Sequence, residues 1–272
     1  MKTDLLVLRT LTNLHVGSGD INFDIIDNQV QKDEITGLPI IHSSSIKGAF
    51  REHFENEGSN FVEYVFGGDD KNQTDDRAGA YSFFEATLLT RPVRSNKRAY
   101  YNATAPMCLK KLIYMIKVLK IEVSFLGELE RFYEKIKNLK EIIVLDNVQG
   151  IILEDEKAKT RSDLKVDIEF LKDLAIYPDE KFKKLELPVI ARNKIGKDGI
   201  SENLWYEEIV SKESQFFFFI AKPEHIDEED RKKAESFDER FLKKGEIIQI
   251  GANKSIGYGF CEVRRLSWVK RE

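Results

Sequence analysis

The sequence predicts an α+β fold, because strand-like segments at both ends of the chain enclose helices and long irregular excursions. The first strand is LLVLRTLTNLHV (5–16), rich in leucine and valine, which ends at the turn-forming GSGD. EIIQIGANKSIGYGFCEVRRL (246–266) has the pattern of strand, glycine loop and strand. QFFFFIAK (215–222) contains four consecutive phenylalanines, which indicate a strand buried on both faces.

The segments between these strands are expected to form further helices and strands. HSSSIKGAFREHFEN (42–56) has apolar residues at helical spacing after a run of serines, which predicts a helix. GAYSFFEATLLTRPV (79–93) predicts a strand that Pro92 stops, and MCLKKLIYMIKVLK (107–120) predicts a basic amphipathic helix. We also expect a strand at 141–146, a short helix near 163–175, a hairpin over 187–210 with a KDG turn, and a charged helix over 225–245.

The composition is that of a globular domain. Of the 272 residues, 42% are hydrophobic and 33% charged, which excludes a disordered tail, a coiled coil and a collagen-like chain. The two cysteines have no CxxC or Cys/His ligand spacing, so a structural zinc is not expected. We find no signal-peptide pattern and no apolar run of about 20 residues, and therefore expect a cytoplasmic protein without a membrane partner.

Charge is distributed unevenly along the chain. The formal net charge is −4, yet the stretch from Ala86 to Ile121 contains no acidic residue. A basic strip with tyrosines suits a polyanion groove, in which cations bind phosphates and rings stack on bases. The alternative is a solvated lysine-rich helix face followed by a loop. The basic residues are Arg91, Arg94, Lys97, Arg98, Lys110, Lys111, Lys117 and Lys120.

Two further segments are suited to binding an anion. In GANKSIGYGF, glycines allow close backbone approach, and Lys254 and Ser255 can contact phosphate, although a glycine-rich turn is the alternative. The segment is neither a P-loop nor a dinucleotide fingerprint. HSSSIKGAFR places hydroxyls and free N–H groups at a helix start, with Lys47 and Arg51 one turn apart. An ordinary serine N-cap with solvated basic residues is the alternative there.

Taken together, these segments resemble the RAMP superfamily of CRISPR effector proteins. LHVGSGD with IIDNQVQKDEITGLPIIHSSSIKGAFRE is similar to its N-terminal signature, a glycine turn followed by a P-x-x-x-S-S-x-K-G-x-x-R helix entrance. GANKSIGYGF is similar to its glycine-rich loop, and VFGGDD with AGAYSFFEATLL resembles an internal block. RPVRS (91–95) and LWYEE (204–208) resemble hallmarks of the backbone subunit, the fourth, of the type III-B (Cmr) complex.

The resemblance implies a single RAMP domain over 1–272 with a ferredoxin-like (RRM-like) palm. Insertions would lie at about 122–187 and 225–245, and a β-hairpin thumb at about 188–208. Such a subunit polymerises with copies of itself along CRISPR RNA, joins other Cmr subunits and cuts complementary target RNA at regular intervals. The implied RNA-binding residues are Ser44, Lys47, Arg51, Arg91, Arg94, Lys97, Arg98, Gly251, Lys254, Ser255, Gly257 and Gly259.

The cleavage residue of that family is an aspartate between the first strand and the first helix, and IIDNQVQKDE has Asp27 at this position. The family implies Mg²⁺ or Mn²⁺, for which Asp27 would be a ligand. One loop carboxylate can hold a hydrated ion or help to deprotonate a ribose 2′-hydroxyl, but cannot form a two-metal site. Asp24 is the nearest rival, and either aspartate could cap a turn instead. His15 is a second catalytic candidate, for phosphate contact or proton transfer, although a lone histidine is more often structural.

Several other functions remain open on the sequence. DNxxxxD (27–33) also resembles the loop of the type III-A (Csm) backbone subunit. A structural RAMP subunit would bind CRISPR RNA without cutting, and a RAMP endonuclease would process CRISPR RNA precursors alone. Glu207 and Glu208 at the hairpin base are candidates for positioning metal or phosphate, although solvent-exposed strand glutamates are common.

Overall fold

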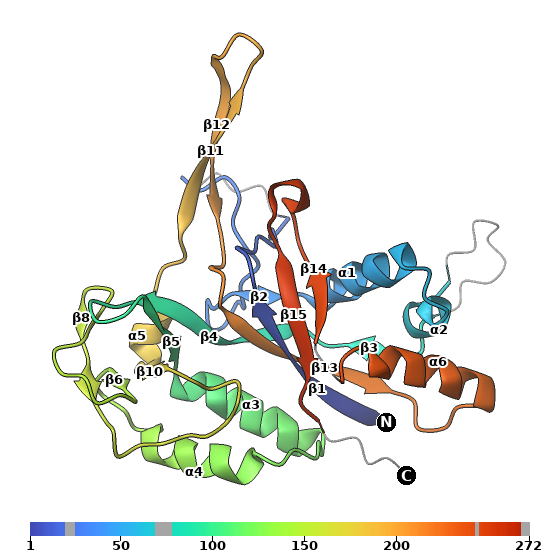
Figure 1. The fold of residues 1–272 in the computed structure, drawn as a ribbon, viewed down its shortest axis with the longest axis horizontal. Helices are drawn as coiled ribbons and strands as arrows, with labels where there is room; N and C mark the ends of the chain where they lie inside the picture. Colours follow the sequence, from blue (N-terminus) through green and yellow to red (C-terminus); the bar gives the residue numbers. More distant parts are fainter. Residues whose placement is uncertain (20–24, 69–77, 243–244, 268–272) are drawn as a thin grey trace.

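A large mixed sheet forms the centre of the molecule, which is a computed structural model describing residues 1–19, 25–68, 78–242 and 245–267 (Figure 1). Among the strand pairs that the described residues form in this sheet, β5–β10 and β6–β9 are parallel and the others antiparallel. The β2 strand (Ile40–Ile41) pairs with β4, and β3 (Ser82–Phe83) pairs with β13. The main order is β14 (Glu246–Gln249), β15 (Phe260–Arg265), β1 (Lys2–Thr10), β13 (Gln215–Lys222), β4 (Ala86–Arg94), β5 (Tyr100–Thr104), β10 (Leu174–Ile176), β6 (Ile143–Val144) and β9 (Lys159–Thr160).

The strands β1 and β13 carry the core on both sides of the sheet. All eight residues of β13 are buried, so the prediction of a doubly buried strand at 215–222 is confirmed. Side chains alternate between faces, and Leu6 and Phe218 join one apolar cluster while Val7 and Phe217 join the other.

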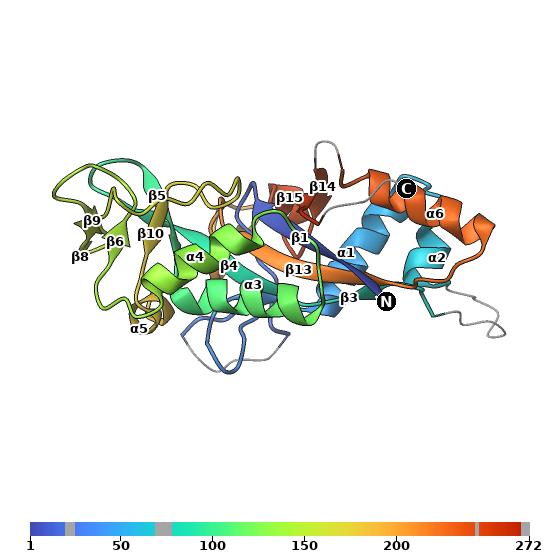
Figure 2. The ribbon, with the colours of Figure 1, turned by 90° about the horizontal axis from the view of Figure 1, so that it is seen from below.

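Helices cover both faces of the sheet (Figures 1 and 2). On one side, α1 (Ser43–Asn56), α2 (Val62–Phe66) and α6 (Glu228–Glu239) contribute aromatic rings to the first cluster. On the other side, α3 (Pro106–Val118) and α4 (Leu126–Ile136) contribute aliphatic side chains to the second cluster. None of the helices in the described parts of the chain has the length and apolar character needed to cross a membrane.

The region 122–187 extends the sheet and supplies part of its core. It contains α4, a small hairpin of β7 (Ile152–Leu153) and β8 (Glu156–Lys157), and α5 (Asp179–Lys183). The helix expected near 163–175 is wrong, because this segment forms turns that place Leu164 and Leu171 in the second cluster before β10 begins. Pro92 does not stop its strand either, since β4 continues to Arg94 with Pro92 paired to Asn102.

A two-stranded hairpin projects from the body, as Figure 1 shows. It consists of β11 (Val189–Ile195) and β12 (Ser201–Glu208), which confirms the two strands expected over 187–210. Beside its base lies the loop between β14 and β15, which contains the short helix η1 (Lys254–Ile256). The expected strand, glycine loop and strand over 246–266 is therefore confirmed as well.

Candidate functional site

The base of the hairpin is anchored by the Glu207 side chain, which lies at the end of β12 and is only 4% exposed. Its Oε2 accepts hydrogen bonds from Arg192 Nε at 2.9 Å and Nη2 at 2.7 Å, across the hairpin. Asn253 Nδ2 donates to both carboxylate oxygens from the glycine loop, at 2.9 and 3.0 Å. The Arg192 guanidinium also lies over the Tyr258 ring, 4.7 Å from its centroid. Glu207 therefore joins the hairpin to the glycine loop.

The neighbouring Glu208 holds a different segment. Its Oε1 accepts from Lys32 Nζ at 2.7 Å and its Oε2 from the Val30 backbone N–H at 3.2 Å. Glu208 is 5% exposed, so both glutamates are buried rather than solvated strand residues. Buried charges require partners, and these two carboxylates find them in separate loops. We call Glu207, Glu208 and these partners the hairpin-base cluster.

Asp27 lies on the surface of this cluster. Its Oδ2 accepts a hydrogen bond of 2.7 Å from the Tyr206 backbone N–H of β12. The next residue, Asn28, forms a parallel bridge with Glu207, in which the Asn28 N–H donates to Tyr206 O and the Glu208 N–H donates to Asn28 O. The exposed carboxylate is thus fixed through one oxygen, and within the described residues its Oδ1 has no hydrogen-bond partner. The rival Asp24 lies outside the described residues.

His15 lies underneath the surface. Its ring is buried, with Nδ1 2.7 Å from the Glu208 carbonyl oxygen and Nε2 3.9 Å from Glu207 Oε1. The backbone oxygen of His15 accepts from the Ala252 N–H of the glycine loop. The expected direct contact of the imidazole with phosphate does not fit this position, because the ring is only 5% exposed. His15 instead contacts the residues that position Asp27.

The cluster provides one open carboxylate for a metal ion. Arg192 and Asn253 occupy the Glu207 oxygens, and Lys32 and a backbone N–H occupy those of Glu208. Asp27 alone fits a hydrated ion that takes its remaining ligands from water and phosphate. In the described part of the chain, three metal-type ligand atoms come within 4.8 Å of one another elsewhere, at His53, Glu57 and Glu246. There Arg240 already forms ion pairs with both carboxylates.

A second surface combines the start of α1 with the glycine loop. Lys254 Nζ lies 3.1 Å from Glu52 Oε1 in α1, so the glycine loop contacts this helix one residue beyond the predicted anion-binding segment 42–51. His42 precedes the helix without a side-chain cap, and Ser44 and Ser255 are exposed. Free N–H groups at a helix start and nearby cations favour an anion. The described residues give Lys47 no ionic partner, whereas Arg51 Nε donates to Glu55 at 2.6 Å.

Two of the loop glycines are required by the chain itself. A Cβ on Gly251 would lie 2.3 Å from the His15 oxygen, and one on Gly259 would lie 2.0 Å from the Ile250 oxygen. Both have positive φ angles, near +80°, which favour glycine. The close approach expected of these two glycines is therefore made to their own backbone. Gly257 faces open space.

The basic strip of 86–121 is neutralised in part by other described residues. Arg91 is buried and donates to the backbone oxygens of Leu185 and Glu186 at 2.8 and 2.6 Å, so the expectation that it faces RNA is wrong. Burial lowers the pKa of the Arg91 guanidinium from its ordinary value. The ion-paired members are Arg94 with Glu154, Arg98 with Asp173 and Lys117 with Glu130. In the described residues, no such partner is found for Lys97, Lys110, Lys111 and Lys120.

These carboxylates all come from the region 122–187, which lies outside the acid-free stretch of 86–121. Sequence reasoning also missed Arg192, Asn253 and Tyr206, which hold Glu207 and Asp27 in place. Arg192 and Tyr206 lie in the predicted hairpin, and Asn253 in the glycine loop. Their position in the hairpin and in the glycine loop is the signal in the sequence that could have identified them.

The fold and the RAMP-like motifs define a class of protein. A family model of the RAMP superfamily matches residues 7–262, which is most of the chain. The chain therefore belongs to the RAMP superfamily.

Particular relatives are similar over nearly the full length. The curated CRISPR system Cmr endoribonuclease Cmr4 of Pyrococcus furiosus is 28% identical over 288 residues, covering 97% of this chain and 95% of that protein. A chain of a type III-B Cmr-β complex bound to cognate target RNA has the same fold, with a TM-score of 0.80, 23% identity and 98% coverage of both chains. Oligomeric Cmr4 of Pyrococcus furiosus gives a TM-score of 0.71 at 22% identity, covering 99% of this chain and 100% of that one.

Proposed function

We propose that this chain is a backbone subunit of a type III-B CRISPR effector complex. It polymerises along CRISPR RNA, joins other Cmr subunits and cleaves complementary target RNA at regular intervals. The observation that carries the proposal is Asp27, an exposed carboxylate held by the hairpin base at the position of the family's cleavage residue. The name of the Pyrococcus furiosus relative, an endoribonuclease, supports the same activity and favours type III-B over type III-A.

The chemistry is cleavage by the RNA's own 2′-hydroxyl. The free oxygen of Asp27 accepts the proton of the 2′-hydroxyl or orients it, and the 2′-oxygen bonds to the adjacent phosphorus as the bond from phosphorus to the 5′-oxygen breaks. The 5′-oxygen takes its proton from water, which leaves a 2′,3′-cyclic phosphate and a 5′-hydroxyl. The Tyr206 N–H keeps the carboxylate in place. Mg²⁺ or Mn²⁺ with Asp27 as a ligand would neutralise charge that develops on the phosphate. His15 acts as a positioning residue, because its ring contacts Glu208 and faces Glu207.

The RNA duplex is held between a palm and a thumb. The sheet with α1 serves as the ferredoxin-like palm of one domain spanning 1–272, and the β11–β12 hairpin serves as the thumb. The hairpin presents apolar side chains to solvent, among them Ile195, Ile200 and Leu204, which are 64%, 65% and 55% exposed. Exposed apolar side chains on a projecting hairpin suit insertion against bases and a neighbouring copy.

The guide RNA backbone lies against the start of α1 and the glycine loop. Lys47, Ser44 and Ser255 are available there, and a phosphate would compete with Glu52 for Lys254. Contacts to phosphate alone bind RNA without regard to sequence. Arg51 and Gly257 belong to the same surface. Arg94, Lys97 and Arg98 contribute at its periphery, where RNA phosphates compete with the carboxylates that already pair with the two arginines.

The test compares Asp27→Asn with the wild-type chain in the reconstituted complex. Asparagine retains an oxygen that can accept the Tyr206 N–H, so the loop stays in place while the negative charge is lost. The matched control is Glu34→Gln, which removes an exposed carboxylate from the same loop. We expect Asp27→Asn to abolish cutting with target binding intact, and Glu34→Gln to cut normally. Persistent cutting by Asp27→Asn would favour a purely structural RNA-binding subunit or another cleavage residue.

A further inference from the structure

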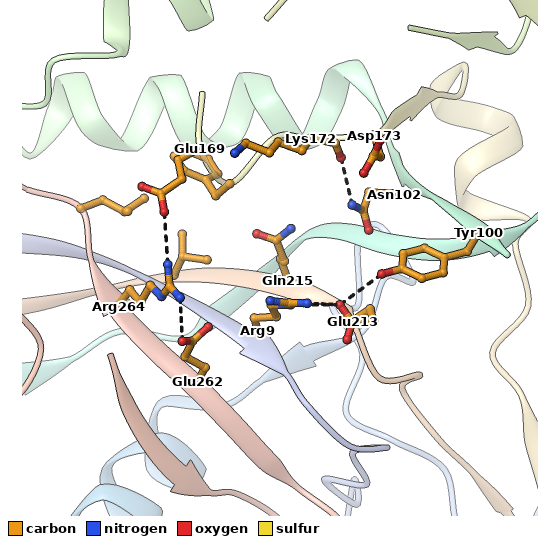
Figure 3. Close-up of a pocket in the computed structure, with 13 residues that line it drawn as sticks. Arg9, Tyr100, Asn102, Glu169, Lys172, Asp173, Glu213, Gln215, Glu262 and Arg264 are labelled. Atoms are coloured by element: carbon orange, nitrogen blue, oxygen red, sulfur yellow. Dashed lines mark hydrogen bonds and ion pairs between the residues drawn. The ribbon is translucent and has the colours of Figure 1, made fainter. Parts of the chain in front are cut away.

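A pocket of about 250 Å³ lies on the α3 and α4 side of the sheet and shares no residue with the hairpin-base cluster (Figure 3). Side chains of β1, β13 and β15 form its floor, and β5 and the segment 169–173 form its wall. Its volume is below the roughly 300–1,000 Å³ of pockets for drug-sized ligands, which suits a single small ring system.

Gln215 is the polar group at the centre of this pocket. It is only 8% exposed, and Figure 3 shows its carboxamide directed into the space between the lining residues. Within the described residues its side chain has neither a donor nor an acceptor partner. The pairing register between β13 and β4 shifts at Gln215, and such irregularities often re-aim a side chain beside a functional site. Among the described residues, neither carboxamide atom of Gln215 is a fully buried polar atom without a partner, so both are accessible from the pocket, where a ligand with a matching donor and acceptor can bind them.

The rim of the pocket is rich in hydrogen-bond acceptors. Glu213 Oε2 accepts from Arg9 Nε at 3.0 Å and from the Tyr100 hydroxyl at 3.3 Å. Arg264 is neutralised by Glu262 at 2.7 Å and by a second carboxylate, that of Glu169, at 3.2 Å. These carboxylates disfavour a phosphate at the rim.

Asn102 adds a further acceptor beside Gln215. Its Nδ2 donates to the Lys172 carbonyl oxygen at 2.9 Å, which leaves Oδ1 without a partner in the described residues. The pocket therefore offers one carboxamide with both donor and acceptor, surrounded by additional acceptors. Tyr100 and Phe170, which also line it, provide aromatic surface.

We propose that this pocket binds one nucleobase that carries an exocyclic amino group. The Gln215 carboxamide pairs with an adjacent donor and acceptor on the base edge, as carboxamides do with adenine. The second N–H of the amine donates a hydrogen bond to Asn102 Oδ1 or to a rim carboxylate, and an aromatic ring contacts the base face. Uracil also matches the carboxamide but lacks the amine, so it binds less well. The base belongs either to a bound RNA strand, a source that rests on the proposed function, or to a free nucleotide.

The experiment measures binding of AMP, CMP, GMP and UMP to the full chain by calorimetry, alongside oligouridylates that contain a single A, C or U at the centre. We expect a preference of about tenfold for amino-bearing bases, which corresponds to one hydrogen bond. Gln215→Leu should lose this preference, whereas Gln149→Leu, an exposed glutamine, should keep it. Tyr100→Ala, at a half-buried position, provides a second test if Gln215→Leu does not fold.

If only the oligonucleotides show the preference for amino-bearing bases, the site binds a base of an RNA strand. If the nucleotides show it too, the site can bind either a free nucleotide or a base of an RNA strand. The proposal is overturned if UMP binds as tightly as the amino-bearing nucleotides and uridine-only RNA binds as tightly as RNA with a central A or C. An unchanged preference in Gln215→Leu overturns it as well. The proposed function fails separately, when Asp27→Asn cuts target RNA like the wild type, because Asp27 does not line this pocket.

Discussion

Replacing Glu207 by glutamine should loosen the hairpin from the body of the molecule. The Glu207 and Arg192 side chains are 6% and 19% exposed, so the substitution leaves a largely buried guanidinium without its counter-charge. Breaking a fully buried pair costs about 3–5 kcal/mol. Because Arg192 is partly solvated and glutamine still accepts one hydrogen bond, we expect a loss of about 2 kcal/mol, or roughly 30-fold in the opening equilibrium.

Hydrogen exchange of the Tyr206 and Glu208 amides measures this opening, since these N–H groups donate to Asp27 and Asn28. The matched control is Glu202→Gln, which breaks an exposed pair with Lys194 in the same hairpin and should change exchange at the hairpin base by less than about twofold. Equal exchange rates in the two variants would refute the argument that Glu207 anchors the hairpin.

Three further perturbations test other parts of the structure. Arg91→Ala should lower the free energy of unfolding by about 2 kcal/mol, because it removes two hydrogen bonds of a buried guanidinium, and should not change the salt dependence of RNA binding; a reduced salt slope would return Arg91 to the RNA interface. Lys254→Gln should reduce the slope of log affinity against log salt by about 0.7 for single-stranded guide RNA, and an unchanged slope would exclude a phosphate contact. Burial raises the pKa of Cys108 to about 12, so the native thiol stays protonated while the unfolded thiol ionises above about pH 9. Stability should therefore fall between pH 9 and 12, by up to about 1.4 kcal/mol per pH unit, and urea titrations should show a shallower fall in Cys108→Ala.

The sequence was most informative where a local pattern determines the element. QFFFFIAK and the strand–loop–strand of 246–266 have strong propensities and clear turns, and both elements occur as predicted. The region 122–187 was not resolved by such reasoning, because its strands of two or three residues exist only through pairing with β5 and with one another. The helix expected near 163–175 does not form, because the sheet extension buries Leu164 and Leu171 in turns.

The candidate site was predictable in its residue types but not in its contacts. Asp27 could be identified by resemblance, while its hydrogen bond to Tyr206 joins positions far apart in the chain. The acid-free stretch was misleading for the same reason. Composition along the chain says nothing of Glu154 or Asp173, which approach Arg94 and Arg98 only in the folded structure.

The contact between Asp27 and the hairpin separates two effects of hairpin mutations. Because the Tyr206 N–H fixes the Asp27 carboxylate, displacement of the hairpin base must move this proposed cleavage group, whereas changes at the tip leave it in place. Shortening 194–200 should therefore alter the spacing of target cuts at a nearly normal rate, and Glu207→Gln should slow cutting at normal spacing. Mapping cut positions and single-turnover rates in the same reconstituted complexes separates the two effects. A tip deletion that slows cutting as much as Glu207→Gln would mean that Asp27 is positioned by the whole hairpin rather than by its base.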